Sequence, residues 1–134
     1  MQRQIIQYVL LDAVSATTHS SVKLVSDFQH KDVVISTSGL GTGDSITVKV
    51  KVAFTDAAPD FTAAQSSANE WTYVQLINLE DGSPEDGDLG VTISEVDGVL
   101  AYSVNADGVR WLVAELSAIT DPTTSATVRL SQYN

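Results

Sequence analysis

Apolar and polar side chains alternate strictly over the ten residues from Ser45 to Phe54. A period of two sustained over this length, rich in β-branched residues, predicts a half-buried β-strand. The glycine-containing segment Gly39–Asp44 predicts a turn that joins this strand to another at Asp32–Ser36. The apolar side of the later strand consists of Ile46, Val48, Val50, Val52 and Phe54, and the other side of Ser45, Thr47, Lys49, Lys51 and Ala53.

Two further apolar runs, Val91–Val96 and Val99–Val104, are separated by the pair Asp97-Gly98. This pair between alternating segments is typical of a two-residue β-hairpin turn. In the register set by such a turn, Ile93 faces Tyr102 on an apolar face, and the opposite face is small and polar. The sequence therefore predicts an antiparallel hairpin that lies over a core.

Strands are also expected at Ile5–Leu11, Ser21–Val25, Trp71–Asn78, Val109–Leu116 and Ala126–Leu130. A short helix over Ile5–Val14 is the alternative for the first of them. No segment has the pattern of a long amphipathic helix. About nine short strands predict a single antiparallel β-sandwich, jelly-roll-like in its strand arrangement. Residues 1–18 are expected to form an N-terminal arm or first strand, and residues 19–134 the sandwich domain.

Two of the expected strands, Trp71–Ile77 and Val109–Leu116, are apolar on both faces. The outer face of an antiparallel sandwich normally meets water, so these outer residues need a further cover. The long irregular segment Thr55–Asn69 is one candidate for this cover, since a loop of that length in a compact domain is usually functional. A neighbouring subunit is the other candidate, and the sequence leaves both open.

The charge of the chain is strongly acidic and unevenly distributed. The net charge is −10, and between Val52 and Val109 there are eleven acidic residues and no Lys or Arg. Such a surface repels nucleic acid and anionic lipid, so neither nucleic acid nor membrane is an expected partner. Solubility is the simplest reason for the acidity; a high-salt environment and docking onto a basic partner are the alternatives. The sequence has no cysteine, which excludes disulfides and thiolate metal sites.

The densest acidic run, Glu80–Asp88, is the best candidate for a metal site, because calcium binds clustered carboxylates. Its spacing does not fit an EF-hand loop. Counted from Asp81, the sixth position is Asp86 where glycine is required, and the twelfth is Thr92 where glutamate is required. A solvated hairpin loop is the favoured interpretation, and no cofactor is expected.

The chain contains no pattern typical of an enzyme. The segment Gly39–Gly43 precedes a strand and not a helix, so it does not predict a phosphate-binding loop. Asp12 and His19 form no recognisable catalytic motif. We therefore expect no enzymatic activity. The aromatic side chains of Trp71, Tyr73, Tyr102 and Trp111 are expected in strand interiors, where core packing is favoured over a sugar-binding platform.

Two stretches resemble the small β-sandwich auxiliary proteins of tailed-phage virions. The first runs from Leu10 to Ser36 and includes Leu10–Thr18, Ser21–Leu24, Phe28 and Val33–Ile35. The second, from Gly108 to Leu130, contains Gly108-Val109-Arg110-Trp111 and the closing strand Ser125–Leu130. This second pattern is similar to that of capsid-decorating proteins. The acidic segment Thr55–Asp88 has no counterpart in the resemblance.

The resemblance implies a structural virion protein, assembled in the host cytoplasm, that binds the outer capsid surface and stabilises it. The implied partners are the major capsid protein and further copies of the chain, as a dimer or trimer. A tail or neck component, and a carbohydrate-binding or adhesin module, are the alternatives. The N-terminal arm and the strand Val109–Leu116 are the expected contact surfaces, and the predicted interface residues are Ile5, Ile6, Tyr8, Leu10, Trp71, Leu112 and Leu116.

Overall fold

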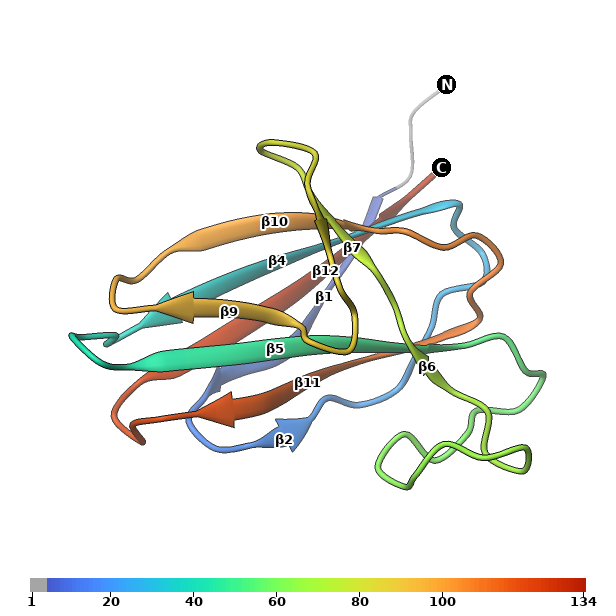
Figure 1. Cartoon of the computed structure of the whole chain (residues 1–134). Helices are drawn as coiled ribbons and strands as arrows, with labels where there is room; N and C mark the ends of the chain where they lie inside the picture. The colour runs from blue at the N-terminus through green and yellow to red at the C-terminus, as the bar shows by residue number, and fades with distance from the viewer. Residues whose placement is uncertain (1–4) are drawn as a thin grey trace.

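The computed structural model describes residues 5–134, which form two antiparallel sheets packed face to face (Figure 1). These residues form twelve strands and no helix, so none of them builds a helix able to cross a membrane. The predicted antiparallel sandwich is confirmed. There are more strands than the expected nine because several have only two residues, too few for alternation to reveal. The first four residues of the predicted arm lie outside the described part of the chain.

The first sheet has β1 at one edge, and β1 pairs with the C-terminal strand β12. Position 5–14 is therefore a strand, and the alternative of a short helix there is wrong. The order across this sheet is β1 (Ile5–Val14), β12 (Ser125–Tyr133), β4 (His30–Ser38), β10 (Val99–Val104), β7 (Leu76–Asn78) and β8 (Pro84–Glu85).

The second sheet is built around the long pair β11 and β5, which run side by side through its centre (Figure 1). Two short strands flank β11 and two flank β5. The strands are β2 (Thr18–His19) and β3 (Lys23–Leu24) beside β11 (Trp111–Ile119), and β6 (Thr72–Tyr73) and β9 (Val91–Ser94) beside β5 (Ser45–Ala53).

An apolar core fills the space between the two sheets. Inward-facing side chains from β5, namely Ile46, Val48, Val50 and Val52, are at most 1% exposed. They pack in one cluster with residues of the first sheet that include Val33, Ile35, Val128 and Leu130. The alternation in the sequence thus predicted the buried face of β5 correctly up to Val52.

Phe54 departs from the predicted pattern. The strand β5 ends at Ala53, and the Phe54 side chain is 51% exposed. The chain leaves the sheet here because the Trp111 indole Nε1 donates a hydrogen bond to the Thr55 carbonyl oxygen at 2.9 Å. The chain therefore continues into a long loop and does not extend the strand by another residue.

The predicted hairpin across Asp97-Gly98 is wrong. β9 pairs with β5 in the second sheet, whereas β10 pairs with β4 and β7 in the first. The turn between them crosses from one sheet to the other, and Glu95 adopts a positive φ of 66° within it. Both Ile93 and Tyr102 still face the core, so the buried faces were predicted correctly and only the pairing was not.

The predicted strand Trp71–Asn78 is likewise divided between the sheets. β6 belongs to the second sheet and β7 to the first. The crossing lies at Val74 and Gln75, where the Val74 amide donates to Val50 of the second sheet at 3.1 Å and the Asn105 amide donates to the Gln75 carbonyl at 3.0 Å.

Asp97 connects the turn between β9 and β10 to the turn between β4 and β5, which also crosses from the first sheet to the second. Its carboxylate accepts hydrogen bonds from the backbone amides of Gly39 and Leu40, each at 2.9 Å, in the turn between β4 and β5. These bonds lower the pKa of Asp97, that from Leu40 most strongly, because they stabilise the charged form. A hairpin turn on its own would offer no such donors, so the Asp97 carboxylate joins two turns that are far apart in the sequence.

We predict that Asp97→Asn lowers the urea midpoint of unfolding at pH 7. The folded pKa is lowered, so the contribution of the carboxylate is complete above the ordinary aspartate pKa of about 3.9 and is lost as pH falls through the folded value. The difference between wild type and variant should therefore shrink in acid. Asp12→Asn is the matched control, because Asp12 is exposed and has no hydrogen bond or ion pair to a described residue. Equal midpoints for the two variants would contradict the role of Asp97.

Candidate functional site

Residues 54–71 form a loop at the end of the second sheet where β5 ends and β6 begins, and we call it the covering loop (Figure 1). Phe61 at its centre is only 3% exposed. It packs in a small cluster with Ala53 and Val113 from the sheet, and the rings of Trp71 and Trp111 lie against this cluster. Of the two covers considered for the apolar outer face, the structure contains the loop of the same chain.

Two indole groups hold the covering loop. The Trp111 Nε1 of β11 donates to the Thr55 carbonyl oxygen at the start of the loop, and the Trp71 Nε1 donates within the loop to the carbonyl oxygen of Ala63, also at 2.9 Å. The Trp71 ring meets the Tyr73 ring edge to face at a centroid distance of 5.2 Å. Each half-buried indole therefore has a partner for its polar N–H.

Lys51 is the central anchor of the covering loop. It projects from the outer face of β5 and is only 4% exposed. Its ammonium group donates to the Phe61 carbonyl oxygen at 2.9 Å and lies 2.8 Å from the Glu115 carboxylate. The same group lies 4.2 Å from the centre of the Trp71 ring, a cation–π contact shielded from water.

His19 completes this charge cluster from the edge strand β2. Its Nε2 atom lies 2.7 Å from Glu115 Oε2 and 2.9 Å from Lys51 Nζ. A protonated Nε2 donates to Glu115, whereas an unprotonated Nε2 accepts from Lys51. Three charged or titratable side chains from three strands thus converge beneath the loop.

The distal part of the covering loop is held by its own hydrogen bonds. The Asn69 side chain accepts from the Asp60 amide at 2.8 Å and donates to the carbonyl oxygens of Asp60 and Ala64. The Asp60 carboxylate accepts from the Thr62 hydroxyl and amide, and these bonds lower the pKa of Asp60. These hydrogen bonds within the loop therefore hold its distal part in a defined conformation.

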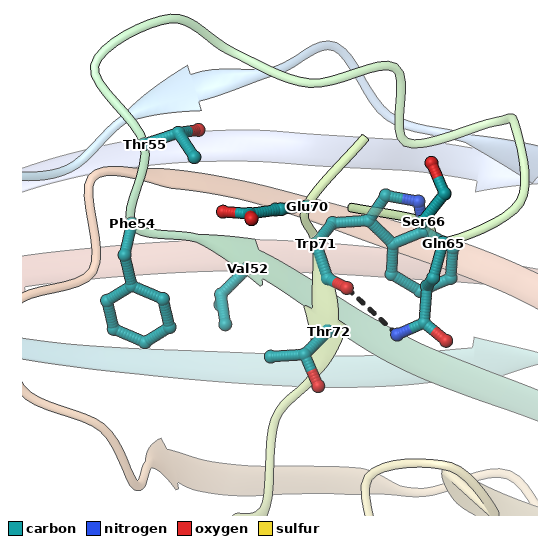
Figure 2. Close-up of a pocket in the computed structure, with 8 residues that line it drawn as sticks. All are labelled: Val52, Phe54, Thr55, Gln65, Ser66, Glu70, Trp71 and Thr72. Atoms are coloured by element: carbon teal, nitrogen blue, oxygen red, sulfur yellow. Dashed lines mark hydrogen bonds between the residues drawn. The ribbon is translucent and has the colours of Figure 1, made fainter. Parts of the chain in front are cut away.

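A cavity of about 410 Å³ opens where the covering loop meets the end of β5 and the start of β6. In Figure 2 the Phe54 ring and the Val52 and Thr72 side chains surround its apolar part, and the Glu70 carboxylate extends toward Phe54 and Thr55. On another side of the cavity, the Gln65 Nε2 donates a hydrogen bond to the Trp71 carbonyl oxygen at 2.8 Å.

Solved structures share this fold. Among them, the SPBc2 prophage-derived protein YomS superposes with a TM-score of 0.65 at 13% identity, over 100% of this chain and 96% of YomS. The PBSX exported protein XepA superposes with a TM-score of 0.67 at 12% identity. This chain is covered completely but spans 39% of XepA.

The likeness is one of fold. At 12% and 13% identity the superpositions establish the sandwich architecture, and function does not follow from architecture alone. Neither a protein-family model nor a curated protein sequence matches the chain.

The predicted interface residues fall into two groups. Leu112 and Leu116 are completely buried and Leu10 is 8% exposed, all in the core between the sheets. The prediction is corrected for these three, because inward-facing side chains offer no surface to a partner. Ile5 is 57% exposed on β1, and the other three, Ile6, Tyr8 and Trp71, are half-buried.

The acidic run Glu80–Asp88 contains the loop that joins β7 to β8. The Asp81 carboxylate accepts from the Ser83 amide and hydroxyl, and these bonds lower the pKa of Asp81. Within residues 5–134, no three His, Asp or Glu side chains are grouped so that they could hold a metal ion.

Of the four aromatic residues weighed as a sugar platform, Tyr102 is only 2% exposed and belongs to the main core. Trp71 and Trp111 pack against the Phe61 cluster. The exposed aromatic ring at the cavity is Phe54, which the alternation had assigned to the interior.

Sequence reasoning missed the Lys51 cluster. Lys51 occupies the polar parity of β5, as Lys49 does, and nothing in the local pattern distinguishes the two. His19 and Glu115 are far from Lys51 in the sequence and meet it only through the pairing of β2 and β5 with β11.

We predict that Lys51→Met lowers the free energy of unfolding by roughly 3 kcal/mol, because it removes the ammonium partner of the largely buried Glu115 carboxylate, which keeps the His19 imidazole beside it, and leaves the Phe61 carbonyl unpaired. Limited proteolysis should then cut within residues 54–71. The double variant Lys51→Met/Glu115→Gln should recover part of the loss, since it removes a buried charge that has lost its ammonium partner. Lys49→Met, on the same strand face but outside the cluster, is the control. Equal stability of the Lys49 and Lys51 variants would contradict the anchoring role.

Proposed function

We propose that this chain is an auxiliary structural protein of a phage virion that docks on the outer surface of the capsid. The observation that carries the proposal is the match, over the whole chain, to the fold of the prophage-derived protein YomS. The resemblance of Gly108–Trp111 and Ser125–Leu130 to capsid-decorating proteins supports the same function.

The free edge of the first sheet supports a docking role. Within residues 5–134, β1 pairs with β12 on one side and with no strand on the other, so that other side presents backbone donors and acceptors to a partner. The pairing is regular from Ile5 to Val9, and Ile5 and Val9 are 57% and 51% exposed. Exposed apolar side chains on an open strand edge are suited to pairing with another strand.

The other predicted contact strand does not offer such a surface. Residues Trp111 and Val113 of β11 lie beneath the covering loop, and the inward-facing residues of β11 are in the core. The N-terminal strand therefore becomes the main docking element of the proposal. Many copies on a capsid lattice would hold firmly even if each contact were weak, because repeated contacts add through avidity.

We predict that the purified chain co-sediments with capsids from which it is absent. The double variant Ile5→Asp/Val9→Asp should lower the pelleted fraction at least about tenfold, since it places two charges in an apolar contact. Val96→Asp is the matched control, because Val96 is 73% exposed and lies in the turn between β9 and β10. Absence of co-sedimentation at every salt concentration would overturn the capsid proposal. If the chain pelleted with isolated tails and not with capsids, the proposed location would change to the tail or neck of the virion.

The same edge predicts self-association. If β1 of one copy pairs with β1 of another, both open edges are used, so the solution mass measured by analytical ultracentrifugation should rise with concentration toward that of a dimer. Ile5→Asp/Val9→Asp should keep the chain monomeric at the concentrations where wild type assembles. A wild-type chain that stays monomeric at high concentration would remove self-association from the proposal and leave capsid docking to the first experiment.

A further inference from the structure

We propose that the cavity beside Phe54 and Glu70 binds the side chain of an arginine from a partner protein. This inference goes beyond capsid docking and does not depend on it. It rests on a juxtaposition at one cavity: an exposed aromatic ring, a carboxylate that has no partner among residues 5–134, and an apolar floor.

The Phe54 ring and the Glu70 carboxylate have no partners within the described residues. The Phe54 ring is 51% exposed and forms no ring contact there. The Glu70 side chain is exposed and takes part in no hydrogen bond or ion pair with those residues, yet it extends over the cavity toward Phe54 (Figure 2). An occupant of this cavity therefore meets a ring face and a carboxylate together.

A guanidinium group suits this pair of surfaces. It is planar, stacks on aromatic rings and presents parallel N–H donors to a carboxylate. Its methylene stem would lie against the exposed Phe54 ring and the Thr72 methyl group, as long cationic side chains commonly do.

A purely apolar side chain would fit the floor less well. It would cover the Glu70 carboxylate without compensating its charge, and an unpaired charge removed from water is costly. A sugar would need several polar partners, but the Gln65 amide nitrogen is already bonded to the Trp71 carbonyl oxygen. The chemistry of the lining thus favours a cation with an apolar stem.

The negative charge of the surrounding segment also favours a cationic occupant. No Lys or Arg occurs between Val52 and Val109, where eleven acidic residues lie. Of the two basic residues that border this stretch, Lys51 is paired with Glu115 and Arg110 lies 3.5 Å from Asp56 of the covering loop. The resulting negative field attracts a cationic partner and speeds its approach.

The test titrates the full ¹⁵N-labelled chain with Nα-acetyl-arginine amide and follows the backbone amide shifts. Saturable shifts should appear at Thr55, Ser66 and Thr72, with an affinity on the order of millimolar as expected for so small a probe. Nα-acetyl-citrulline amide, a neutral probe of nearly the same shape, should bind about fivefold more weakly. Shifts of equal size and affinity for both probes would overturn the proposal, as would no shift with either.

Variants separate the two recognition elements. Glu70→Gln should weaken the arginine probe about fivefold and leave the citrulline probe unchanged. Phe54→Ala should weaken the arginine probe about threefold, and Phe54→Tyr should retain its binding. Glu80→Gln, an exposed acid in the loop between β7 and β8, is the matched control and should change nothing. Tighter binding of methyl-β-glucoside than of the arginine probe at the same amides would overturn the proposal in favour of a sugar site.

Discussion

The buried ammonium group of Lys51 holds the covering loop on the outer face of the second sheet. A charge in that place is tolerated only while Glu115 and the Phe61 carbonyl oxygen remain beside it, so sheet and covering loop are held in one arrangement. Val52, the next residue along β5, and its cross-strand partner Thr72 line the cavity. The anchor and the cavity meet at Trp71, which contacts the Lys51 ammonium group and also lines the cavity, so the loop geometry that buries Lys51 also places Glu70 at the cavity.

The sequence was sufficient to predict which faces of the strands are buried. A sheet packed against another sheet removes every second side chain from water, and this leaves a period of two that can be read without any structure. Ile46 to Val52 obey it on β5, and Ile93 and Tyr102 obey it on β9 and β10. The prediction failed at Phe54 because the strand ends one residue earlier, where a hydrogen bond from a distant indole redirects the chain.

The sequence was not sufficient to predict which strands are neighbours or which polar side chains are buried. A hairpin and a turn that crosses between two sheets have the same alternation, and the Asp97-Gly98 pair suits either turn. The choice depends on whether Asp97 finds the amides of Gly39 and Leu40, which lie far away in the sequence. In the same way, Lys51 becomes a buried anchor only because Phe61 and Glu115 meet it in the folded chain, and no local pattern contains that information.

The two surfaces proposed for partners differ in what they recognise. The edge of β1 offers mainly backbone groups, which any extended segment can pair with, so it supplies affinity on a repeating surface but little selectivity. The cavity at Phe54 offers one carboxylate and one ring in fixed relation, which only a side chain of suitable charge and shape satisfies. Both groups belong to the covering loop, which is the longest segment between strands within residues 5–134. Selectivity for one partner therefore depends on how this loop is held on the sheet.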